Sequence, residues 1–75
     1  MKKLSPLQIV IVENLCEGLN TVQIAKRLGI GESTTQNIIS TIMLKMNCRT
    51  RAEIAAKAVS MGIVSLNTYE FASKT

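Results

Sequence analysis

The sequence predicts an all-α domain built from four short helices, and three observations support this prediction. Each expected helix begins at a recognisable capping signal, no segment alternates apolar and polar residues as a strand would, and the apolar residues are nearly all aliphatic. The chain has 75 residues, enough for one domain, and a domain of this size buries only about 60% of its unfolded surface. We therefore expect a small core of aliphatic side chains.

The first two helices are expected over residues 6–17 and 21–28. Ser5 can cap the first helix, and it is followed by a proline at the first helical position and a glutamine two residues later, which completes a capping box. Asn20 repeats this pattern before the second helix. A glycine follows each predicted end, at Gly18 and Gly29, as is common where helices stop.

The last two helices are expected over residues 32–46 and 51–61. Gly31 is only a tolerable cap for the third helix, whereas Thr50 and Glu53 form a Thr-x-x-Glu capping box before the fourth. Apolar spacing then predicts which side chains of the four helices face the core. These are Leu7, Val10 or Ile11, and Leu15; Val22, Ile24, Ala25 and Leu28; Thr35, Ile39, Ile42 and Met46; and Ile54, Ala58 and Met61.

The composition excludes several classes of function. The chain contains no His, no glycine-rich phosphate loop and no close set of carboxylates, so we expect no enzyme activity, metal or cofactor. One Tyr, one Phe and no Trp argue against binding of single-stranded nucleic acid, which needs aromatic stacking platforms. Nine basic against five acidic residues, a net charge of +4, instead suit a polyanionic partner.

Cysteine usage and hydropathy indicate a cytoplasmic protein. Cys16 and Cys48 have no CxxC spacing, and although a disulfide between them is one alternative, we favour reduced core residues. The longest apolar run, residues 9–12, is too short to cross a bilayer, so no membrane association is expected.

The segment from Asn20 to Met46 carries the strongest functional indication. A short helix, a three-residue break and a longer helix form a helix-turn-helix, which presents its second helix to the major groove of double-stranded DNA. The face of that helix opposite its core stripe is expected to contact bases through Ser33, Thr34, Gln36, Asn37, Ser40 and Thr41. Gln and Asn can pair with adenine and Thr methyls with thymine, so this face favours a site containing A·T pairs. Phosphate contacts are expected from Thr21, Lys26, Arg27, Lys45, Arg49 and Arg51.

The chain resembles the LuxR/GerE-type helix-turn-helix family over about residues 4–64. The resemblance rests on Leu4-Ser5-Pro6, Glu17-Gly18-Leu19-Asn20, Gln23-Ile24-Ala25, Leu28-Gly29-Ile30, Thr34, Ile42, Lys45-Met46 and Arg49-Thr50-Arg51-Ala52-Glu53. It implies a four-helix domain with the third helix in the major groove and dimerisation through the fourth. The chain departs from the family at Gln36 and Ile38, where Lys and His are usual, at Leu7 and Gln8, where an Arg-Glu pair is usual, and at Asn47, where Gly is usual.

The fourth helix carries a second stripe of small apolar residues, which would let another helix approach closely. This stripe consists of Ala52, Ala55, Ala56 and Val59. We expect a homodimer through it and a palindromic operator, the alternative being that both stripes are buried within one monomer. A second hypothesis is a protein-binding module that pairs with a related regulator and modulates it, and the loss of basic recognition residues supports it. No small-molecule substrate is expected.

The domain is expected to occupy residues 1–65, followed by a tail at 66–75. The tail lacks a helical pattern, and Tyr69 and Phe71 either dock onto the domain or belong to a disordered end. Met1 and the short basic lead-in favour a free-standing regulator over a fragment of a longer one. The operator sequence, and whether binding activates or represses, do not follow from the sequence.

Overall fold

The computed structural model describes residues 3–63, and within them the chain forms four helices and no strand. These are α1 (Pro6–Cys16), α2 (Thr21–Leu28), α3 (Glu32–Met46) and α4 (Arg51–Ser60). The all-α, four-helix prediction is confirmed, and the two helices predicted to run one residue further, α1 and α4, end at Cys16 and Ser60. The predicted tail at 66–75, with Tyr69 and Phe71, lies outside the described residues.

Side chains cap three of the four helix starts, and two of the three predicted capping boxes are complete, the described contacts of the Thr50/Glu53 pair containing only the Thr50 half. The Ser5 and Asn20 side chains accept hydrogen bonds from the backbone N–H groups of Gln8 and Gln23, whose side chains accept in return, so both capping boxes form. Thr50 likewise accepts from the backbone of Glu53. The start of α3 has no side-chain cap. These local hydrogen bonds explain why the helix boundaries can be predicted from the sequence.

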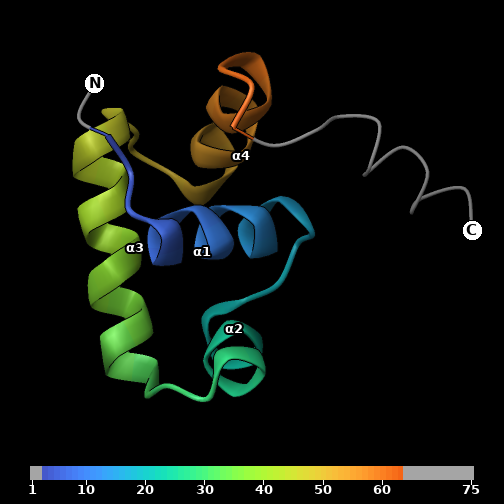
Figure 1. Ribbon diagram of the computed structural model, residues 1–75, viewed down its shortest axis with the longest axis vertical. Coiled ribbons are helices and arrows are strands. Elements are labelled where there is room, and N and C mark those ends of the chain that lie inside the picture. Colours follow the sequence, from blue (N-terminus) through green and yellow to red (C-terminus); the bar gives the residue numbers. More distant parts are fainter. Residues whose placement is uncertain (1–2, 64–75) are drawn as a thin grey trace, which may run out of the picture.

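The longest helix, α3, contacts each of the other three (Figure 1). In this view α3 runs along one side of the molecule, and α1 extends from α3 across the middle. The helices α4 and α2 lie on opposite sides of α1. Gly29, in the left-handed conformation at φ 69°, ends α2, and the chain turns directly into α3. The α2–turn–α3 unit is the helix-turn-helix that the sequence predicts. The helices α1 and α4 also pack against α3.

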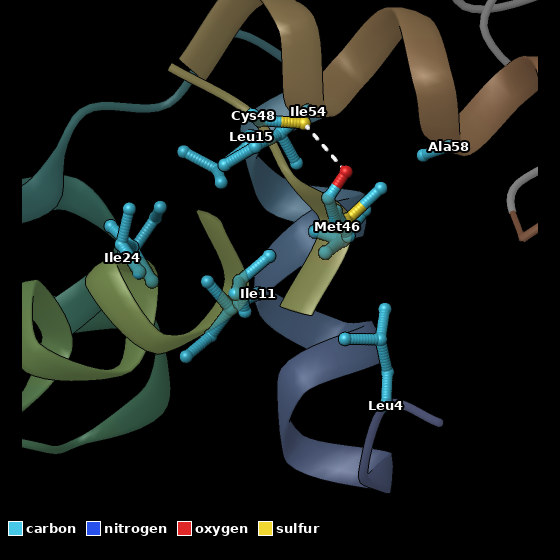
Figure 2. Close-up of a cluster of buried hydrophobic side chains, with 11 residues drawn as sticks. Leu4, Ile11, Leu15, Ile24, Met46, Cys48, Ile54 and Ala58 are labelled. Carbon is cyan, nitrogen blue, oxygen red and sulfur yellow. Dashed lines mark hydrogen bonds between the residues drawn. The ribbon is translucent and has the colours of Figure 1, made fainter. Parts of the chain in front are cut away.

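The core is aliphatic and lies where the four helices meet (Figure 2). Its fully buried members include Ile11, Ile24, Ile39, Ile42 and Ile54, each with no exposed surface. The predicted α3 stripe is confirmed, since Thr35, Ile39, Ile42 and Met46 are all buried. Of the open alternatives in α1, Ile11 is buried and Val10 is exposed.

Three residues predicted to face the core are instead exposed. Leu7 is 45% exposed because the buried face of α1 is centred on Ile11, Val12 and Leu15, which places Leu7 at its edge. Val22, 47% exposed, lies at the edge of the α2 face that carries Ile24 and Ala25.

The third exposed residue is Met61, at 46%, which follows the last helical residue of α4. The chain turns away there through Gly62 at φ 75°, and Ile63 packs against the core in its place. Leu4, at the opposite end of the described chain, is also buried although it precedes the first helix.

Both cysteines are free thiols within the core region. Cys48 is buried, and its Sγ–H group donates to the Met46 carbonyl oxygen at 3.6 Å (Figure 2). Cys16 is half-buried and packs against the same core. Every helix in residues 3–63 is too short or too polar to span a bilayer.

Candidate nucleic-acid interface

One face of α3 is polar and open to solvent along most of its length. All six side chains predicted to contact bases are exposed, and they lie opposite the buried stripe of the same helix. They are Ser33, Thr34, Gln36, Asn37, Ser40 and Thr41. Leu44 continues this face and is 83% exposed, and Ile38 at its border is half-buried. The face therefore presents hydroxyl and amide groups to solvent.

Three predicted contact residues meet in one hydrogen-bonded cluster, which we call the Gln36 cluster: Thr21, Gln36 and Arg51. Arg51 donates from Nη2 to the Gln36 Oε1 atom at 2.8 Å and also to the Thr21 hydroxyl oxygen. The Thr21 hydroxyl in turn donates to Gln36 Oε1 at 3.3 Å. The cluster joins the first residue of α2, the reading face of α3 and the first residue of α4. Sequence patterns assign these residues separate roles and do not indicate that they touch.

Arg27, predicted to contact phosphate, is engaged with α1. Its Nη1 group donates to Asn14 Oδ1 at 2.9 Å and forms an ion pair with Glu17 at 3.3 Å. Asn14 is itself buried, and its amide donates to the Val10 carbonyl oxygen at 2.7 Å. Arg27 thus satisfies a buried polar group and links α1 to α2, a role that sequence reasoning missed because the partners are distant in sequence.

Lys45 is likewise held by hydrogen bonds within the domain. Its Nζ group donates to Gln8 Oε1 at 2.8 Å and to the Lys3 carbonyl oxygen at 3.3 Å. Gln8 is one of the positions where the chain departs from the family pattern. A phosphate contact by Lys45 would have to be made with the donor that remains after these two bonds.

Two other predicted phosphate contacts, Lys26 and Arg49, are exposed. Neither forms a side-chain hydrogen bond or ion pair with another of residues 3–63. The Lys26 ammonium group and the Arg49 guanidinium group can therefore turn toward a polyanion. Lys26 lies in the last turn of α2, within the helix-turn-helix, and Arg49 lies just before α4. Both cations are therefore available for backbone contacts.

The predicted dimer stripe on α4 is partly accessible. Ala52 and Ala56 are exposed, and Ala55 and Val59 are half-buried, with Val59 packed against the core. The alternative that the whole stripe is buried within the monomer is therefore wrong for this part of α4. A small-residue surface is left open along the helix.

No group of three or more His, Cys, Asp or Glu side chains in residues 3–63 could hold a metal ion.

The comparison with family models decides the family. The model of bacterial regulatory proteins of the LuxR family, GerE, matches residues 2–58. The chain belongs to this family. As a LuxR-family helix-turn-helix domain, it is a DNA-binding module of transcription regulation.

A solved structure supports the same assignment. The chain is similar, with a TM-score of 0.81 and 28% sequence identity, to a protein described as the response regulator ChrA of a heme-sensing two-component system. The similarity covers 85% of this chain and 32% of that one, so the LuxR-family domain spans about a third of the length of ChrA. No curated protein matches the chain in sequence.

Proposed function

We propose that this LuxR-family domain binds double-stranded DNA by inserting α3 into the major groove, and that it regulates transcription in the cytoplasm. The observation that carries the proposal is the exposed polar face of α3, which lies across the helix from the buried stripe of Thr35, Ile39, Ile42 and Met46. The buried side of such a helix holds it rigidly against the domain core, while its exposed polar side can contact base edges.

The chemistry of the face suggests a site that contains A·T pairs. Asn37 is exposed, and its side chain forms no hydrogen bond with another of the described residues. It can therefore offer both a donor and an acceptor to adenine N7 and N6. The Thr34 and Thr41 methyl groups, also exposed, can pack against thymine methyls. Each good paired contact is worth about 1–3 kcal/mol of discrimination.

The binding is proposed to be modest for a single domain. Between Glu32 and Leu44 the recognition helix has no basic residue, and Arg27 and Lys45 are engaged within the domain. Of the basic residues predicted to contact phosphate, Lys26 and Arg49 are left to supply unengaged positive charge. Because phosphate neutralisation supplies most of nonspecific affinity, a second copy would be needed for tight binding.

Pairing through α4 would supply that second copy. The exposed Ala52 and Ala56 side chains allow two helices to approach closely, and a two-fold pair reads two half-sites with fixed spacing. The proposed regulator is accordingly a homodimer on a palindromic operator.

Selection from a pool of random duplex DNA at two salt concentrations tests the proposal. We expect enrichment of a two-fold-symmetric site that contains A·T pairs. Its affinity should fall steeply as salt rises, because binding releases cations from the phosphates and added salt opposes that release. A matched variant, Asn37→Ala, should relax preference at one position of each half-site without reducing the folded fraction.

The second candidate function is pairing with a related regulator through α4 without DNA contact. The exposed small-residue surface of α4 and the internal engagement of Arg27 and Lys45 favour it. Absence of binding to any duplex at low salt would refute the DNA proposal and favour this one. The pairing itself should be largely insensitive to salt, because it rests on apolar helix contacts.

A further inference from the structure

The Gln36 cluster fixes the orientation of an amide on the reading face. Arg51 has N–H donors only, so the Gln36 atom that faces its Nη2 group at 2.8 Å is the carbonyl oxygen and not the nitrogen. The Thr21 hydroxyl donates to the same oxygen at 3.3 Å, while its own oxygen accepts from Arg51. The three groups are mutually satisfied in this one arrangement.

This arrangement removes the acceptor of Gln36 from base recognition. A carbonyl oxygen has two lone pairs, and here the two are taken by the guanidinium and the hydroxyl. The exposed side chain retains only its NH₂ group, which has two donors and no acceptor. The usual paired contact of a glutamine with adenine needs the oxygen for the adenine N6 amino group, so it cannot form while the cluster is intact.

We propose that Gln36 reads its base as a donor only and thereby selects guanine over adenine, with Arg51 acting as the positioning residue. This inference rests on the proposed function. Guanine presents two acceptors in the major groove, N7 and O6, which both donors of the NH₂ group can meet. Adenine presents one acceptor beside an amino group, and that amino group would face another donor.

The cluster makes the choice rigid because it draws on three helices. Thr21 and Arg51 are the first residues of α2 and α4, and each helix is anchored by its own buried isoleucine, Ile24 or Ile54. The donor geometry of Gln36 is therefore set before DNA arrives, and no side-chain rotation is needed on binding. The guanine position would lie within an otherwise A·T-containing half-site.

The test begins by identifying the position that Gln36 reads. Sites are selected from random duplex DNA with the unaltered protein and with Gln36→Ala, and the position whose preference relaxes is assigned to Gln36. We expect guanine at that position for the unaltered protein. The same selection is then made with Arg51→Met, and with Thr21→Val combined with Arg51→Met, which frees both lone pairs of the carbonyl oxygen.

In these variants adenine should gain on guanine at this position by about fivefold or more, because the paired contact becomes available. Arg49→Met is the matched control, since it removes an exposed arginine that lies two residues from Arg51 in the chain and forms no hydrogen bond with Gln36. It should weaken all sites alike and leave the preference for guanine unchanged. Thr21 and Arg51 are the first residues of their helices, so far-UV circular dichroism is used to verify that each variant folds. If the double variant does not fold, Arg51→Met alone suffices for the test.

The outcomes separate the two proposals. Adenine at the assigned position for the unaltered protein, no position that depends on Gln36, or unchanged preference in Arg51→Met would overturn this inference while DNA binding itself stands. Absence of binding to every duplex by the unaltered protein at low salt would overturn the proposed function and this inference together.

Discussion

Cys16 shows how single residues in this domain are tuned by their surroundings. Burial at the end of α1 raises the pKa of its thiol above the ordinary value of 9.0, and the nearby charges of Glu13 and Glu17 raise the pKa further. The thiolate is the reactive form of cysteine, so a raised pKa keeps this side chain protonated and unreactive at neutral pH. The half-buried thiol therefore behaves as an apolar core residue.

We predict that the pH dependence of Cys16 alkylation shifts upward on folding. In a Cys48→Ala background, the midpoint of the iodoacetamide rate against pH should lie higher for the native domain than for the same chain in urea. Glu13→Gln removes one neighbouring negative charge and should lower the native midpoint. A native midpoint at or below that of the unfolded chain would show that the charges and burial do not act as described.

At the scale of the elements, the end of α3 depends on an unusual residue. Asn47 takes the left-handed conformation at φ 55°, and it is the only residue other than glycine with a positive φ in residues 3–63. Its carbonyl oxygen and that of Met46 accept hydrogen bonds from the Lys57 ammonium group of α4, at 2.9 and 3.1 Å. Asparagine tolerates this conformation better than residues with bulkier side chains do, so it can replace the glycine usual in the family.

Substitution of Asn47 should separate conformation from side-chain contact. Asn47→Ala should lower the free energy of unfolding by about 1 kcal/mol, because a Cβ-bearing residue without a polar side chain is strained in the left-handed region. Asn47→Gly, the matched control, should leave stability unchanged or raise it. Urea unfolding followed by far-UV circular dichroism measures both, and equal loss in the two variants would assign the effect to the asparagine side chain instead.

The elements also show what the sequence can and cannot predict. Helix boundaries follow from caps such as Ser5 with Gln8, in which both partners lie within one turn, and the periodic stripe of α3 follows from spacing alone. The bonds that arrange the candidate site join partners that are distant in the chain. Lys45 and Gln8 are 37 residues apart, and Arg51 and Gln36 are 15 apart.

The six exposed residues of α3 could thus be predicted from periodicity, since exposure follows once the buried stripe is known. The internal partners of Arg27, Lys45 and Gln36 could not, because no local pattern encodes which helices meet. The exposure of Leu7 and Val22 escaped prediction for the same reason, as an apolar residue at the edge of a helix face is buried only if a neighbour covers it.

At the scale of the whole molecule, the open surface of α4 leads to a prediction about self-association. Ala56 is exposed at the centre of the outward face of α4, whereas Val59 packs against the core. Ala56→Glu should therefore shift the protein toward monomer without unfolding it, because two buried like charges would oppose each other across a two-fold axis. Sedimentation at several protein concentrations measures the shift.

Leu7→Glu provides the matched control for this experiment. It adds the same charge at an exposed apolar residue of another helix, α1, and should leave the association constant unchanged. A protein that sediments as a monomer before any substitution, or a dimer that survives Ala56→Glu, would exclude α4 as the dimer face.

The aliphatic core also determines how this protein can be observed. Residues 3–63 contain no Trp, Tyr or Phe, so the described domain has no intrinsic fluorophore of its own. Its fully buried isoleucines, however, are spread over all four helices, as Ile11, Ile24, Ile39, Ile42 and Ile54. Selective methyl labelling of isoleucine would place a nuclear magnetic resonance probe on every helix at once. Spectra recorded with DNA, and separately with a pairing partner, would then show which helices change their packing on binding each of the two.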